Sequence, residues 1–110
     1  MTTLADDTLS ASFAALADPT RRAIVETLAS GALTSGEIAG RFKVSAPAIS
    51  QHLKTLRNAG LVRVTPKAQQ RIYELDLTGV DAVAGWAAQI RRFWASRLDA
   101  LADRIDEEQP

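Results

Sequence analysis

The chain has 110 residues, of which 46% are hydrophobic and 24% charged, and its 13 Lys and Arg balance its 13 Asp and Glu. This composition is typical of one globular domain and unlike that of a disordered segment. The absence of cysteine excludes disulfides, thiolate metal sites and a cysteine nucleophile. We see no signal peptide and no apolar run of membrane-spanning length, so we expect a cytoplasmic protein.

The positive charge is concentrated in one third of the chain. Between Glu37 and Glu74 there is no acidic residue, and seven of the 13 basic residues lie there: Arg41, Lys43, Lys54, Arg57, Arg63, Lys67 and Arg71. Lys and Arg on phosphates release counterions, so such a region predicts a polyanion as partner. Charge bias alone is equally compatible with a solvated basic face. The motifs inside this stretch must therefore distinguish a polyanion-binding region from a solvated basic face.

The first two helices are predicted from apolar spacing and from their caps. Apolar residues recur at helical spacing over residues 8–17, and Thr8 can cap that helix. Asp18 can then cap a second helix, with Pro19 in its first position, where a missing N–H costs nothing. We expect this helix to stop near Gly31.

A helix-turn-helix is predicted over residues 34–60. Thr34 and Glu37 have the spacing of a capping box, which opens a short third helix. Ser45 can cap a fourth helix that ends at Gly60 in a left-handed conformation. Two helices joined by so short a turn form this motif.

The periodicity then changes to alternation, which predicts a two-stranded hairpin over residues 61–77. In the second strand Tyr73, Leu75 and Leu77 fall on one face, and Pro66 places the first strand at an edge. The connection from Lys67 to Gln70 lacks an Asn-Gly or Asp-Gly pair, so we expect a loose, mobile tip.

A long last helix is predicted over residues 79–106, starting at Thr78 or Asp81. Its large apolar residues lie at three- and four-residue steps. We expect the first and last helices to pair with a second copy through Leu9, Phe13, Trp86, Ile90, Phe93, Trp94, Leu98 and Leu101. An alternative for the same aromatic stretch is an apolar effector pocket, with Arg91 or Arg92 available for an anionic ligand.

The fourth helix has an apolar face and a polar face. Its polar face presents hydroxyl, amide and ammonium groups, which hydrogen-bond base edges and phosphates in the major groove. Ser50 and Gln51 lie where such a helix reads bases, and Lys54 and Arg57 lie where it meets phosphate. On the hairpin, Arg63, Lys67 and Arg71 would follow the DNA backbone. These side chains together predict a duplex DNA interface.

His52, the only histidine, is open to two interpretations. It could ligate a metal or act as a switch, but no second ligand stands at ligand spacing. We therefore favour a packed or hydrogen-bonded histidine.

Three separated segments, residues 14–24, 45–56 and 59–62, resemble the ArsR (ArsR/SmtB) family of bacterial winged-helix repressors. The resemblance implies a mainly α fold with a small β-hairpin, a winged helix-turn-helix of about five helices and a two-stranded wing, forming a homodimer. It also implies DNA contacts at Ala46, Pro47, Ser50, Gln51, Lys54 and Arg71, and hence a bacterial protein associated with the nucleoid.

The sequence departs from the metal-sensing members of that family. The stretch Gly36–Gly40 has no cysteine pair, and residues 81–106 contain no histidine. We therefore expect no sensing of metal through the usual sites, and no cofactor.

The sequence as a whole predicts a single domain spanning residues 1–110, acting as a dimeric, sequence-specific repressor of a pseudo-palindromic operator. Its own gene is one potential target. Its expected partners are operator DNA, a second copy of itself and an unidentified small-molecule effector, but no membrane. The alternative is a protein-interaction module that docks a partner protein through the last helix. An enzyme is not expected, because no catalytic constellation is present.

Overall fold

The structure, a computed structural model, describes residues 4–108. In chain order the elements are α1 (Leu4–Leu16), α2 (Pro19–Leu28), β1 (Leu33–Thr34), α3 (Ser35–Ala39), α4 (Ala46–Asn58), β2 (Val62–Lys67), β3 (Gln70–Leu75) and α5 (Leu77–Glu108). The predicted mainly α fold with five helices and a hairpin is confirmed. The expected single domain extends past the described residues at both ends.

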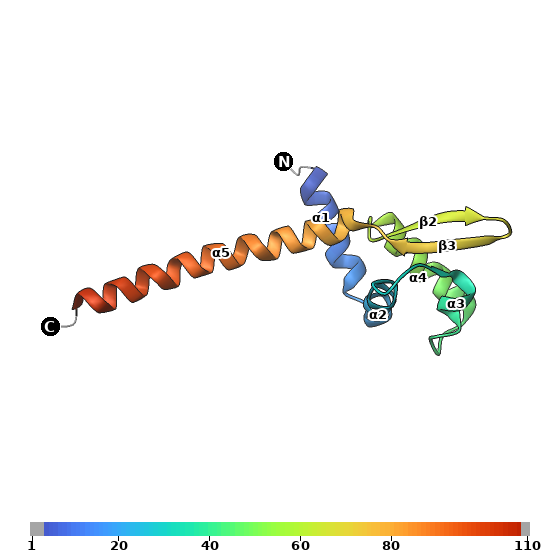
Figure 1. Cartoon of the computed structure of the whole chain (residues 1–110), viewed down its shortest axis with the longest axis horizontal. Helices are drawn as coiled ribbons and strands as arrows, with labels where there is room; N and C mark the ends of the chain where they lie inside the picture. The colour runs from blue at the N-terminus through green and yellow to red at the C-terminus, as the bar shows by residue number, and fades with distance from the viewer. Residues whose placement is uncertain (1–3, 109–110) are drawn as a thin grey trace.

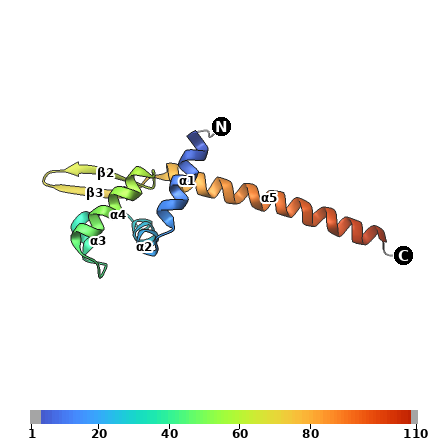
Figure 2. The ribbon, with the colours of Figure 1, turned by 180° about the vertical axis from the view of Figure 1, so that it is seen from behind.

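The molecule is elongated, with a long helix at one end and a hairpin at the other (Figure 1). Its radius of gyration is 19.5 Å, against about 13 Å for a compact domain of this length. The difference comes from α5, which leaves the body on one side while the β2–β3 hairpin leaves it on the other. Seen from behind, α4 lies beside the hairpin, at the end remote from the tip of α5 (Figure 2).

The sheet has three strands rather than the two expected from the sequence, in the order β1-β3-β2. The additional strand is β1, whose Leu33 pairs with Tyr73 and whose Thr34 pairs with Ile72. Strand pairing therefore joins the hairpin to the connection between α2 and α3. Pro66 lies within β2, at the edge of the sheet, as predicted.

The helix caps form as the sequence predicts. Thr34 Oγ1 accepts from the Glu37 N–H at 3.1 Å, and Glu37 Oε1 accepts from the Thr34 N–H at 2.9 Å, which completes the capping box. Asp18 and Ser45 each accept from the backbone N–H three residues later. Gly60 has φ 76°, the left-handed conformation expected after α4.

The capping box predicts a pH dependence of stability. The hydrogen bond from the Thr34 N–H holds the pKa of Glu37 below its ordinary value of 4.5. A lowered folded-state pKa gives stabilisation that is present above pH 4.5 and is lost as the pH falls through the folded-state pKa. Glu37→Gln should therefore unfold more easily than the wild type at pH 7, and the difference should shrink toward pH 3. Urea unfolding at both pH values measures it; a difference independent of pH would contradict this assignment.

Two predicted helix starts are wrong. The first helix begins at Leu4, so Thr8 lies inside α1 rather than at its cap. The last helix begins at Leu77, before Thr78 and Asp81, and the Asp76 carboxylate accepts from the Thr78 N–H at 3.0 Å. Because Leu77 is helical and 59% exposed, it does not continue the sheet face with Tyr73.

The expected loose hairpin tip is also wrong. Lys67 pairs directly with Gln70, so only two residues connect the strands. Ala68 adopts φ 56°, a left-handed conformation that usually selects glycine, asparagine or aspartate. The continuous strand pairing imposes the turn without the usual turn residue.

The core lies between α4, the sheet and the short helices α2 and α3. Its fully buried side chains are Ile24, Ile38, Ile49, Leu53, Leu56, Leu61 and Val62. Burial of each such aliphatic side chain stabilises the folded state by about 1.5–3 kcal/mol relative to leaving it exposed. α4 is therefore held by its apolar face.

A second close contact joins α1, the end of α4 and the start of α5. The Gly79 N–H donates to the Gly60 carbonyl at 2.8 Å. The buried Ser12 hydroxyl of α1 donates to the Thr8 carbonyl at 2.8 Å and lies 3.5 Å from the Ala59 carbonyl. This contact, termed here the α1–α4–α5 junction, sets the direction in which α5 leaves the body.

Although α5 has 32 residues, charged side chains interrupt it, and within residues 4–108 no helix meets the length and hydropathy needed to span a bilayer.

Candidate nucleic-acid interface

The two faces of α4 separate as the sequence predicts. Ile49, Leu53 and Leu56 are buried. The exposed side chains are Ala46, Pro47, Ser50, Gln51, Lys54, Arg57 and Asn58. An amphipathic helix held by one face offers its polar face to a partner at little entropic cost, because the backbone is already fixed.

The N-terminal half of α4 is positioned by its cap. Ser45 Oγ accepts from the Ala48 N–H at 3.2 Å, which fixes the first turn. Ala46 and Pro47 are small and exposed there, so another surface can approach the backbone closely. Ser50 and Gln51 follow one turn later, with hydroxyl and amide groups free to face solvent. This arrangement suits the N-terminal part of a recognition helix in a major groove.

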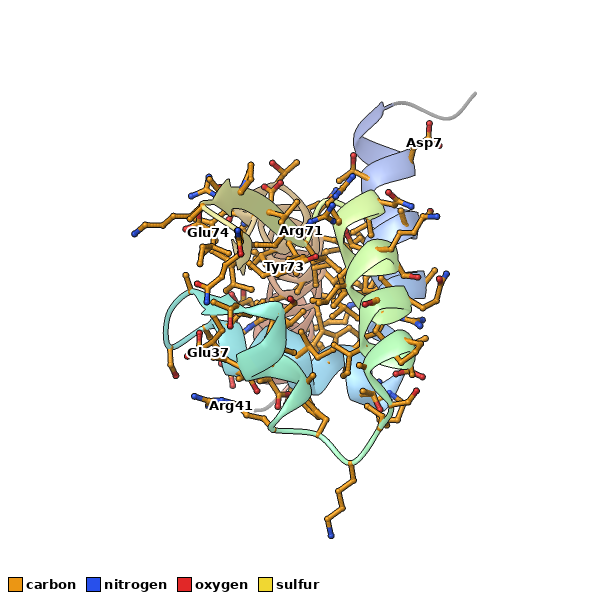
Figure 3. All side chains as sticks on the ribbon, turned by 90° about the vertical axis from the view of Figure 1, so that its right-hand side faces the viewer. Asp7, Glu37, Arg41, Arg71, Tyr73 and Glu74 are labelled. Atoms are coloured by element: carbon orange, nitrogen blue, oxygen red, sulfur yellow. The ribbon has the colours of Figure 1, made fainter. Side chains whose placement is uncertain are left out.

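The hairpin divides its cations between two faces. Alternate residues of a strand share a face, so Arg71 lies on the same side as Tyr73. Arg63 and Lys67 lie on the other side, with Glu74, the cross-strand partner of Arg63. Figure 3 shows Arg71 and Tyr73 on the side of the hairpin that faces α4, with Glu74 on the outer side. Arg71 therefore belongs to the α4 side of the molecule.

Arg63 is neutralised by a neighbour. Its Nε donates to Glu74 Oε1 at 2.9 Å, an ion pair between exposed side chains. This hydrogen bond raises the pKa of Arg63 above its ordinary value. Lys67 is exposed at the hairpin end. Arg63 thus differs from Lys67, which lies on the same face of the hairpin, and from Arg71, which faces α4, by its ion pair with a carboxylate.

A recess of about 300 Å³ lies between α4 and the hairpin. Its lining residues, termed here the basic recess, are Ser50, Leu53, Lys54, Arg57, Asn58, Arg71 and Tyr73. Arg57 and Arg71 also line an adjoining recess of about 180 Å³ with Val64 and Pro66. The places of Asn58 and Tyr73 in this recess do not follow from the sequence, because the recess forms only when the hairpin folds beside α4.

Arg21 connects the body to α4, a contact that the sequence did not reveal. Its Nε donates to the Ala15 carbonyl at 2.7 Å, and its Nη1 lies 3.4 Å from Nδ1 of His52. His52 is therefore hydrogen-bonded, as favoured from the sequence. Among the described residues no group of three His, Cys, Asp or Glu side chains could hold a metal ion.

The predicted pairing residues on α5 lie on an apolar stripe that is open in the single chain. Phe13 of α1 packs edge-to-face on Trp86, with ring centroids 5.2 Å apart. Leu9 of α1 is half-buried. From Trp86 onward α5 leaves seven large apolar side chains exposed, termed here the α5 stripe: Trp86, Ile90, Phe93, Trp94, Leu98, Leu101 and Ile105. So large an exposed apolar surface marks an interaction site.

Comparison with known proteins gives a consistent result. Residues 18–64 match the family described as bacterial regulatory protein, arsR family. The chain is 50% identical over 94 residues to the HTH-type transcriptional regulator Rv2034 of Mycobacterium tuberculosis, covering 86% of this chain and 85% of that protein. It is 39% identical over 74 residues to the transcriptional repressor SdpR of Bacillus subtilis, covering 67% and 82%.

A solved structure supports the same assignment over nearly the whole fold. The crystal structure of the ArsR family transcriptional regulator RHA00566 superposes with a TM-score of 0.76 at 31% identity, covering 87% of this chain and 98% of that one. The matched part of the sequence includes α4 and the start of β2. The chain therefore belongs to the arsR family of bacterial regulatory proteins.

Proposed function

We propose that this protein is a dimeric, sequence-specific DNA-binding repressor of a pseudo-palindromic operator, with its own gene as one potential target. The observation that carries the proposal is the exposed polar face of α4, with the basic recess beside it. Helices of this kind read base edges, while flanking cations bind phosphates. The similarity to the transcriptional repressor SdpR supports repression as the mode of regulation.

The residues have different roles in this proposal. Ser50 and Gln51 read base edges, and Ala46 and Pro47 permit close approach to the DNA. Phosphate binding falls to Lys54, Arg57 and Arg71, with Lys67 at the hairpin end. Arg63 contributes only if DNA displaces Glu74, because the two are paired at 2.9 Å.

The dimer is supported by the α5 stripe. Trp94 is 59% exposed and Phe93 is 65% exposed in the single chain. A second copy that covers this stripe would bury both, and a two-fold axis would present two α4 helices to successive major grooves. A pseudo-palindromic operator follows from that symmetry.

The proposal is tested by selecting fragments of the source genome that the protein binds, which yields the operator and its neighbouring genes together. If no fragment is enriched and no duplex is retarded at low salt, the alternative of a protein-interaction module that docks a partner protein through α5 replaces it. An effector acting on the dimer is tested by adding metabolites to the same binding assay and looking for a change in operator affinity.

Gln51→Ala should reduce discrimination between the operator and random duplex. One lost bidentate base contact costs about 1–3 kcal/mol, which corresponds to about 5- to 150-fold. Fluorescence anisotropy on both duplexes measures the ratio of affinities. The matched control is Gln89→Ala, an equivalent change at an exposed position of α5, which should leave the ratio unchanged. An unchanged ratio for Gln51→Ala would refute direct reading by Gln51.

A further inference from the structure

We infer that the basic recess is a discrete binding site for one phosphate group, at which Lys54, Arg57 and Arg71 hold the same anion. The phosphate belongs either to the DNA backbone or to a free phosphate-bearing anion that competes with DNA. For the DNA phosphate the inference rests on the proposed function. For the free anion it stands on the recess alone.

The first support is convergence from two separate elements. Lys54 and Arg57 come from α4, and Arg71 comes from β3, yet all three line one recess of about 300 Å³. Arg57 and Arg71 also both line the adjoining recess. Alternation along β3 fixes Arg71 on this side, because it lies two residues from Tyr73, which lines the same recess.

The second support is the absence of any neutralising partner in the described part of the chain. The ion pair found there joins Arg63 to Glu74, on the outer face of the hairpin. The side chains of Lys54, Arg57 and Arg71 make no ion pair or hydrogen bond with any described residue. Like charges that line one recess repel each other even in water. An anion bound between them would offset that repulsion by attracting all three.

The remaining lining residues fit a phosphate group. Ser50 and Asn58 supply neutral hydrogen-bond donors at the rim, both exposed. Tyr73 is 8% exposed and forms a rigid floor. Cations and neutral donors around one concave surface, with no carboxylate in the lining, provide the charge-assisted hydrogen bonds that phosphate oxygens accept. A phosphate bound here would also tie the hairpin to α4.

The number of phosphates bound is measurable from the salt dependence of DNA binding. The slope of log K against log salt is about −0.9 per phosphate neutralised. We compare the wild type with the triple variant Lys54→Gln, Arg57→Gln, Arg71→Gln on random duplex DNA. If the three cations share one phosphate, the slope magnitude should fall by about 1 for each bound subunit, which is about 2 for a dimer bound through both subunits. A fall of about 3 for each bound subunit, expected for three separate phosphates, would overturn the inference.

A matched control uses cations that lie outside both the recess and the hairpin. The triple variant Arg41→Gln, Lys43→Gln, Arg104→Gln removes the same charge from exposed positions. It should leave phosphate titration unchanged, which shows that net charge alone does not create the site. If both triple variants alter phosphate binding equally, the recess is not a discrete site and the inference fails.

The free anion is tested without DNA. Inorganic phosphate is titrated at constant ionic strength while NMR follows the backbone N–H signals of Ser50, Asn58 and Tyr73, which line the recess and are retained in the recess variant. Saturable shifts in the wild type, absent from the recess variant, support the site; a linear drift in both proteins together with a slope change other than about 1 for each bound subunit overturns it. Linear drift with a slope change of about 1 for each bound subunit assigns the recess to DNA phosphate and excludes the competing anion. If the wild type binds no duplex DNA, the proposed function fails, whereas the phosphate titration still decides the recess.

Discussion

Trp94→Glu is expected to convert the protein from a dimer to a monomer at micromolar concentration. Trp94 is 59% exposed in the single chain, so the substitution leaves the core of the subunit intact. In a dimer that covers the α5 stripe, the same change removes a large aromatic contact and buries an unpaired carboxylate. Loss of one such residue costs about 2–4 kcal/mol, so the dimer dissociation constant should rise about 30- to 700-fold. Sedimentation velocity over a concentration series measures it.

Ser96→Glu provides the matched control. Ser96 is exposed two residues further along α5, and at 100° per residue it falls on the face opposite the stripe, near Asp99 and Asp103. The same added charge there should leave the dimer unchanged. If Trp94→Glu sediments as a dimer like Ser96→Glu, the stripe is not the subunit interface. A monomeric Trp94→Glu should also bind operator far more weakly, because only one α4 engages at a time.

Gly79→Ala is expected to destabilise the fold by about 1–3 kcal/mol, through overpacking at the α1–α4–α5 junction. An added Cβ would lie 2.8 Å from the Gly60 carbonyl oxygen and 2.9 Å from both Leu61 Cδ2 and Ser12 Oγ. Leu61 and Ser12 are fully buried, so moving either side chain would disrupt the packing around it. The backbone of α5 must therefore shift away from α4. Urea unfolding at one fixed protein concentration measures the loss.

Gly85→Ala makes the same chemical change six residues later and should have the opposite effect. An added Cβ at Gly85 meets nothing within 4 Å, and the residue lies on the face of α5 opposite the stripe. Alanine is favoured over glycine in a helix interior by about 1 kcal/mol, so this variant should be more stable than the wild type. Equal stability of the two variants would show that packing at the junction does not limit the fold.

The sequence predicts most features that depend only on residues close together in the chain. The caps at Asp18, Thr34 and Ser45 form as expected, because a cap needs only a side chain and a backbone N–H three residues later. The polar face of α4 also follows from spacing along one helix. Two local predictions were wrong: the start of the first helix at Thr8 and the placing of Leu77 in the strand. Whether a helix includes each of these positions depends on the segments beside it.

Features that depend on distant segments could not be predicted. β1 has two residues and no signal of its own, and it exists because Tyr73, forty positions later, supplies its partner. The contact between Arg21 and His52 joins two helices with no shared motif. The basic recess likewise requires the hairpin register, which decides that Arg71 faces α4 while Arg63 faces away. The sequence predicted both arginines as DNA-binding and could not distinguish them.

The opposite directions of α5 and the hairpin have an evolutionary consequence. No residue of the α5 stripe takes part in the α4 surface or the basic recess. On the proposed function, substitutions that alter the choice of partner subunit therefore leave base recognition untouched, and the reverse also holds. After gene duplication, two such proteins could diverge in their target sites while still forming mixed dimers, or lose mutual pairing while keeping a common target.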